Sequence, residues 1–265
     1  MIDWKKRGTK AMLGRYFTLL GIALVLSASG GCGGDQTSDQ NTTLPSANTA
    51  EGLWSGTTNT NRTLTTAVLD DGTYYFFYSS AVNPNQIAGV IQGTGTSNNG
   101  SFTSTNAKDF GIGVAVQEAT ISGDSAARQF FNGTITYSGA GPVTFTSSYN
   151  KAYDTAPTVA SLAGVYNGQA GSSGGVQAAT VTASDHGTFT GIEPNSKCTF
   201  TGTVTARTRG NVFDQRITFD GTNCFFAGRT FLGIVYFDIP TQRLLAAAPK
   251  NDRTDAAFFF GTKIP

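Results

Sequence analysis

The chain has 265 residues, with 18 Lys and Arg against 17 Asp and Glu, and a net charge of +1. A charge so near zero lacks the concentrated basic surface that nucleic-acid binding requires, so nucleic acid is excluded as an expected partner. The length allows one or two domains.

The N-terminus has the polarity of an export signal. Five basic residues, the last of them Arg15, precede an apolar segment at residues 19–28. This segment has about half the length that a helix needs to cross a ~30 Å hydrocarbon core. The pattern therefore predicts an export signal rather than a permanent transmembrane helix.

Residues 29–32 (SGGC) follow the apolar segment. This stretch resembles the bacterial lipoprotein signal, in which signal peptidase II cuts before a lipid-modified cysteine. The resemblance implies a signal peptide at 1–31 and a lipid anchor on Cys32, where two or more acyl chains give stable membrane binding. In a Gram-negative cell, Gly33 after the cysteine implies the outer membrane. Ser29 departs from the aliphatic residue of the family pattern, which leaves cleavage by signal peptidase I and a secreted protein as an alternative.

Removal of residues 1–31 takes away five basic residues and one acidic residue, so the mature chain has 13 − 16 = −3 charges. Residues 32–50 are polar, lack aromatic side chains and are rich in Ser, Thr and Asn. Such a segment buries too little apolar surface to fold, and we expect a flexible tether.

The three cysteines are an odd number for an exported protein. If Cys32 carries lipid, Cys198 and Cys224 remain as a pair. In an oxidising compartment a disulfide between them would close a loop and stabilise the fold by roughly 3.5 kcal/mol in the chain-entropy model. The alternative is a pair of buried free thiols.

After residue 50 the chain shows no sustained helical periodicity and reads as short strands separated by turns, which predicts an all-β fold. The pattern lapses at residues 152–160 and a second series starts at Leu162. In the first series we expect strands at 53–57, 64–69, 73–79, 86–93, 101–105, 114–121, 131–137 and 143–149.

The two series resemble copies of one unit. Residues 52–56 (GLWSG) correspond to 164–168 (GVYNG), and the turn at 70–74 (DDGTY) corresponds to 185–189 (DHGTF). A third match pairs 130–133 (FFNG) with 225–228 (FFAG). The common order of these matches predicts a tandem repeat.

Two segments, 74–78 (YYFFY) and 256–260 (AAFFF), are apolar on both faces. A strand presents alternate residues to opposite faces, so these strands should be buried on two sides or meet a partner.

Around 105 residues and eight strands per half fit two small closed antiparallel β-barrels, at 51–155 and 161–265, because closure removes exposed sheet edges. The glycine-aromatic starts and threonine-rich hairpins are loosely similar to avidin-type barrels and to the barrel lobes of surface lipoproteins that bind host proteins. A β-sandwich for each half is the alternative.

Motifs for catalysis are weak. His186 is the only histidine and is expected in an exposed hairpin turn. Residues 171–175 (GSSGG) match G-x-S-x-G but lack the following helix that a nucleophile elbow needs. Asp70 and Asp71 are expected as turn residues, since a glycosidase needs two carboxyl groups facing one bond. No metal site and no cofactor are expected.

Arginine and aromatic side chains remain as candidates for ligand contact. The chain from residue 156 has 9 − 7 = +2 charges, against 4 − 7 = −3 for 51–155. Arginines of this second half are able to recognise carboxylate or phosphate groups, and aromatic strands to offer a surface for a sugar or an apolar ligand. The candidate ligand contacts are Arg207, Arg209, Arg216, Arg229, Tyr74 and Tyr78.

Together these features predict an exported, membrane-anchored lipoprotein that acts as a non-enzymatic binding or surface-interaction module. Its expected partners are the membrane, through the lipid, and a protein, a glycan or a small apolar ligand. A periplasmic structural or assembly accessory is one alternative. A secreted enzyme with an unrecognised site is the other.

Overall fold

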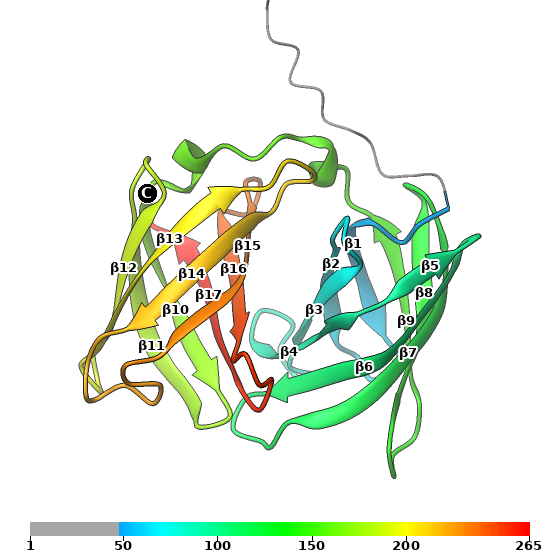
Figure 1. Cartoon of the computed structure of the whole chain (residues 1–265), viewed down its shortest axis with the longest axis horizontal. Coiled ribbons are helices and arrows are strands. Elements are labelled where there is room, and N and C mark those ends of the chain that lie inside the picture. The colour runs from blue at the N-terminus through cyan, green and yellow to red at the C-terminus, as the bar shows by residue number, and fades with distance from the viewer. Residues whose placement is uncertain (1–47) are drawn as a thin grey trace, which may run out of the picture. The chain divides into compact units, whose positions relative to one another are not determined.

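The computed structural model describes residues 48–265, which belong to one compact unit (Figure 1). The expected signal peptide at 1–31, the lipid-bearing Cys32 and nearly all of the tether at 32–50 lie outside the described residues.

The first barrel is an antiparallel sheet in the order β4-β3-β2-β1-β9-β8-β7-β6, and pairing of β4 with β6 closes it. The short strand β5 (Thr96–Asn98) extends the sheet by pairing with the start of β6. The eight barrel strands are β1 (Gly52–Thr58), β2 (Thr63–Val68), β3 (Thr73–Ser79), β4 (Ile87–Thr94), β6 (Ser101–Gly111), β7 (Gln117–Ala126), β8 (Phe130–Tyr137) and β9 (Val143–Tyr149).

The second barrel runs up and down from β10 to β17, and β10 pairs with β17 to close it. The prediction of two small antiparallel barrels is confirmed, and the alternative of a β-sandwich is wrong. The strands are β10 (Gly164–Ser172), β11 (Gly175–Ala183), β12 (Thr188–Glu193), β13 (Cys198–Ala206), β14 (Phe213–Phe219), β15 (Thr230–Asp238), β16 (Arg243–Pro249) and β17 (Ala256–Lys263).

Two short 3-10 helices, η1 (Lys151–Asp154) and η2 (Val159–Leu162), connect the barrels where the strand pattern lapses. The expected strand at 114–121 was placed too early. The chain turns after β6 with Gly113 at φ +69°, so β7 begins at Gln117.

The first repeat match places equivalent residues at the start of each barrel. Trp54 in β1 and Tyr166 in β10 are fully buried, and each donates a hydrogen bond to the carbonyl oxygen four residues earlier, at Ala50 and Leu162. Gly56 and its counterpart Gly168 leave no room for a side chain. A Cβ there would lie 2.0 and 1.9 Å from a backbone oxygen of the neighbouring strand.

The match of 130–133 with 225–228 is wrong. Residues 130–133 belong to β8, the seventh strand of the first barrel, whereas 225–228 lie in the loop between β14 and β15, the fifth and sixth strands of the second. Two adjacent phenylalanines and a glycine suit a strand in one place and a loop in the other.

The barrels pack against each other through a shared apolar layer, which we call the seam. On β3, Tyr74 and Phe76 face the lumen of the first barrel, while Tyr75 and Phe77 join the seam. Residues of the second barrel complete it, and the rings of Phe77 and Phe260 meet edge to face at 6.0 Å. The prediction that the doubly apolar strands are buried on both sides is confirmed.

We expect Phe77→Ala to lower the free energy of unfolding by about 3–5 kcal/mol, because it empties a ring-sized volume in the seam. Urea denaturation measures the change. The control is Val82→Ala in the β3–β4 loop, where the side chain is 92% exposed and its removal should cost less than about 0.5 kcal/mol. A similar small loss for both variants would contradict a tightly packed seam.

Candidate functional site

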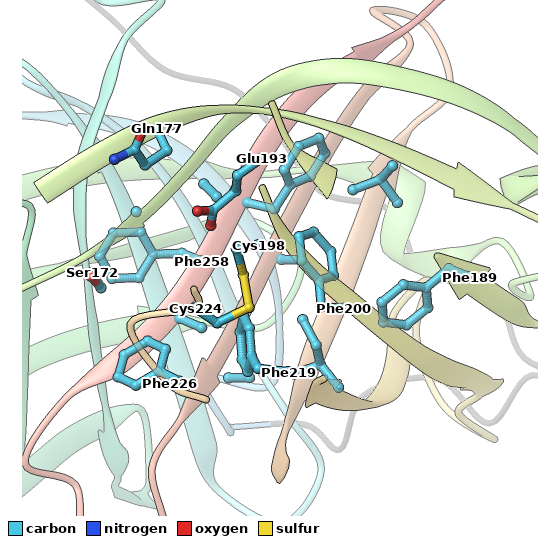
Figure 2. Close-up of a pocket in the computed structure, with 18 of the residues that line it drawn as sticks. Ser172, Gln177, Phe189, Glu193, Cys198, Phe200, Phe219, Cys224, Phe226 and Phe258 are labelled. Carbon is cyan, nitrogen blue, oxygen red and sulfur yellow. A yellow bond between two sulfur atoms is a disulfide. The ribbon is translucent and has the colours of Figure 1, made fainter. Parts of the chain in front are cut away.

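The lumen of the second barrel contains a cavity of about 320 Å³. Inward-facing side chains of strands β10 to β17 form its wall, and most of them are apolar. Figure 2 shows several of the aromatic rings arranged around this space. The ring-bearing side chains that line it include Tyr166, Phe189, Phe200, Phe219, Phe226 and Phe258.

Small side chains on one wall help to leave this space open. The lumen-facing residues of β16 are Leu244, Ala246 and Ala248, and Ala170 and Gly171 of β10 also line the cavity. The volume fits the lower end of the range of small-molecule pockets, which are mostly apolar with a few placed polar groups.

The lumen of the first barrel is packed differently. The rings of Trp54, Phe76, Phe102, Phe131 and Phe145 pack together in it, with neighbouring centroids 5.1–5.9 Å apart in edge-to-face contacts. Such contacts are favoured by the ring quadrupoles. The two barrels therefore share a topology but differ in how side chains fill their lumens.

One end of the second barrel forms the mouth of the cavity. Successive antiparallel strands alternate in direction, so every second turn of the barrel falls at the same end. The lining includes Gly174 from the β10–β11 turn, Ser196 from the β12–β13 turn and Phe225 from the β14–β15 loop. These three connections lie at one end and surround the opening.

A disulfide fastens the β14–β15 loop at this mouth. Cys198, the first residue of β13, bonds to Cys224 at 2.05 Å, and both cysteines line the cavity (Figure 2). The predicted pairing is confirmed, and the alternative of free thiols is wrong. Beside it, Phe225 is 65% exposed and lies against Gly174, where a Cβ would approach its ring to 2.8 Å.

The polar groups of the cavity are few. Of the lining residues, all of them in the described part of the chain, only Glu193 carries a formal charge. Ser172 and Gln177 lie toward the β10–β11 turn, and Gln215 faces the lumen from β14 with 7% of its surface exposed. The arrangement suits the enclosure of an apolar molecule with polar contacts at a few points.

The catalytic motifs considered from the sequence are dispersed. Residues 171–175 form the β10–β11 hairpin turn, where Ser172 pairs with Gly175 and Ser173 donates a hydrogen bond to Asp255. His186 is exposed in the β11–β12 turn, which falls at the other end of the barrel. Within residues 48–265 no group of three His, Cys, Asp or Glu side chains is placed to hold a metal ion.

Arg207 and Arg209, in the connection between β13 and β14, contact carboxylates of the first barrel. Arg207 donates to Asp70 at 2.7 Å and, within its own barrel, to Asp214 at 2.6 Å. Arg209 donates to Glu51 at 2.7 Å, and burial raises the pKa of Glu51 against the lowering effect of this guanidinium. The carboxylates that these two arginines recognise thus belong to the chain itself.

The other candidate contacts do not share one site. Arg216 on β14 and Arg229 before β15 are exposed. Tyr74 lies in the packed lumen of the first barrel, where its hydroxyl pairs with that of Ser104 at 2.8 Å and burial raises its pKa to about 12. Tyr78 lines a smaller cavity of that barrel.

This smaller cavity, about 220 Å³, holds a partly buried carboxyl group. Asp109 accepts hydrogen bonds from the hydroxyls of Tyr78 and Tyr137, each at 2.7 Å. The guanidinium of Arg62 lies over the Tyr78 ring, 5.2 Å from its centroid. Burial raises the pKa of Asp109, although both tyrosines and Arg62 act to lower it.

Comparison with known proteins gives no relative from which a function follows. No protein-family model matches the chain, and no curated protein matches it. In the described part, no helix has the length and apolar character to span a membrane.

Glu193 and Gln215 are not among the site residues expected from the sequence. Both stand on strands with alternating burial, in which Phe189, Gly191 and Glu193 share one face of β12 and Gln215 lies between the buried Phe213 and Ile217. Each is a polar residue at a strand position where the alternation predicts an inward-facing apolar side chain, and this is the signal that could have identified both.

Asp109 gives a prediction on pH. Its pKa is raised in the folded state, so the folded protein binds the proton of the Asp109 carboxyl group more tightly than the unfolded protein does. The contribution of this group to the stability of the fold therefore falls as the pH rises above 3.8, the ordinary pKa of Asp. Asp109→Asn should therefore gain stability relative to the natural protein as the pH rises from ~4 to ~7.

Urea denaturation at the two pH values measures this difference. Asp124→Asn, which removes an exposed carboxyl group from β7, is the control and should show a much smaller change. An Asp109→Asn curve parallel to that of the natural protein would contradict the role of the partly buried carboxyl.

Proposed function

We propose that the protein is a non-enzymatic binding protein that takes up a small apolar molecule in the lumen of its second barrel. The observation that carries this proposal is the cavity of about 320 Å³ lined by aromatic and aliphatic side chains. Burial of apolar surface supplies about 25 cal/mol per Å², which is enough for useful affinity in an enclosed site of this size.

The wall of the cavity favours binding over catalysis. Acid–base or covalent chemistry requires a nucleophile and a base within hydrogen-bond reach of the reacting atoms. Glu193 has Ser196 as its hydrogen-bonding partner at 2.8 Å, and the remaining lining is mainly aromatic rings and aliphatic groups. A secreted enzyme remains the less favoured alternative, and turnover that disappears on mutation of Glu193 would support it.

The proposed place of action is the cell envelope, with the barrels held at the membrane by lipid on Cys32. The disulfide between Cys198 and Cys224 supports an oxidising compartment and leaves Cys32 as the unpaired cysteine of three. A periplasmic assembly accessory is the alternative. Protease treatment of intact cells separates the two, since cleavage favours display on the surface and protection favours the periplasm.

The anchor gives a prediction of its own. Mass spectrometry of the mature N-terminus should find a chain that begins at Cys32 and carries a diacylglyceryl group, with Cys32→Ser releasing the protein from membranes. A mature chain that begins before or after an unmodified Cys32 would overturn the anchor and leave the binding proposal untouched.

The cavity gives a direct test of binding. An apolar fluorescent dye should bind the natural protein with enhanced emission, and Ala246→Phe should weaken this binding at least about tenfold, or 1.4 kcal/mol, because the new ring occupies the lumen. Fluorescence titration measures the affinity.

Leu232→Phe is the matched control, since it adds a ring on the exposed outer face of β15. It should leave dye binding unchanged. Equal affinities for the natural protein and Ala246→Phe, with both folded by circular dichroism, would show that the dye binds elsewhere.

A further inference from the structure

Glu193 is a carboxyl group placed on the lumen side of the barrel. It ends β12, and it follows Phe189 and Gly191 on the inward face of that strand. Its partner across the sheet is Cys198, which also faces the cavity. The register therefore fixes the acid at the mouth, beside the disulfide, and Figure 2 shows the carboxylate among the labelled lining residues.

The hydrogen bonds of Glu193 leave one of its oxygens available. Oε2 accepts a hydrogen bond from the Ser196 hydroxyl at 2.8 Å, and that hydroxyl oxygen accepts one from the Cys198 amide. Within residues 48–265, Oε1 has no hydrogen bond and Glu193 takes part in no ion pair. Among the described residues no lysine or arginine lines the cavity, so we expect a positive charge there to come from the ligand.

A second polar group lies toward the other end of the same cavity. Gln215 is more than nine-tenths buried, and its side-chain amide makes no hydrogen bond within the described part of the chain. Buried polar groups rarely stay unpaired, which points to water or a ligand as the partner. Its cross-strand partner Val204 lies six residues along β13 from Cys198, a separation of about 20 Å at roughly 3.3 Å per residue.

From these positions we infer that the cavity selects an elongated apolar molecule with a cationic, hydrogen-bond-donating head group. The head lies at the mouth against Glu193 Oε1, the apolar body lies along the aromatic wall, and Gln215 bonds a polar atom at the far end. An amphiphile with a carboxylate head, such as a fatty acid, is rejected because its charge would face Glu193, and none of the lining residues in the described part of the chain is a cation that could neutralise it. This inference rests on the proposed function and specifies its ligand class.

Displacement of the fluorescent dye by three compounds with one alkyl chain tests the head group. Decylamine, decanol and decanoate each have ten carbons and carry a cationic, a neutral and an anionic head group, respectively. We expect decylamine to bind about tenfold more tightly than decanol, and decanoate to bind most weakly.

Two variants assign the preference to Glu193. Glu193→Gln should reduce the affinity for decylamine to that for decanol and leave decanol unchanged, which also shows that the lumen is intact. Asp185→Asn is the matched control, because it removes an exposed carboxylate from the β11–β12 turn at the opposite end. It should retain the preference for the amine.

The role of Gln215 is tested with the amino alcohol that has the carbon chain of decylamine and a hydroxyl group at its far end. This compound should bind more tightly than decylamine, and Gln215→Leu should abolish the difference in affinity.

The outcomes separate the inference from the function on which it rests. Failure of the dye to bind, or binding unaffected by Ala246→Phe, overturns the proposed function and this inference with it. Dye binding without displacement by any decyl compound, or decanoate as tight as decylamine, overturns the inference alone. So does a preference for the amine that survives in Glu193→Gln. If Glu193→Gln does not fold, the order of affinities of the three compounds for the natural protein still tests the inference.

Discussion

The seam between the barrels is the constraint on which the rest of the structure depends. Each barrel would bury its lumen-facing residues alone, but the outward faces of β3, β16 and β17 carry side chains such as Phe77, Leu245 and Phe260 that need a second cover. An exposed apolar surface of this extent would invite association with other molecules. Packing one barrel against the other removes it from water within a single chain.

Arginines of the second barrel hold both ends of this layer. Arg207 and Arg209 lie in the β13–β14 connection, and Arg253 lies in the β16–β17 turn at the opposite end of the barrel. Arg253 donates to the carbonyl oxygens of Gln92 and Asn106 at 2.6 and 2.8 Å. A planar guanidinium suits such paired contacts. The opposite net charges of the two halves of the chain thus contribute to contacts between the barrels.

Local chemistry predicted the barrels well because strand alternation and turn residues act over a few neighbours. Gly72 and Gly187 take up positive φ in equivalent turns, and the doubly apolar segments were recognised as buried on both sides. The roles of Arg207 and Arg209 depend on carboxylates more than 100 residues away, which no local pattern reveals. The cavity was missed for a related reason, since it arises from the summed volumes of residues on eight strands.

The strand β16 separates the cavity from the seam by the thickness of one sheet. Leu244, Ala246 and Ala248 face the lumen, while Leu245 and Ala247 face the other barrel. Because the two sets alternate, substitutions at even-numbered positions reshape the cavity without touching the contact between barrels. Insertion or deletion of one residue would exchange the two sets. The shape of the cavity is therefore free to change by substitution, while the length of β16 is fixed.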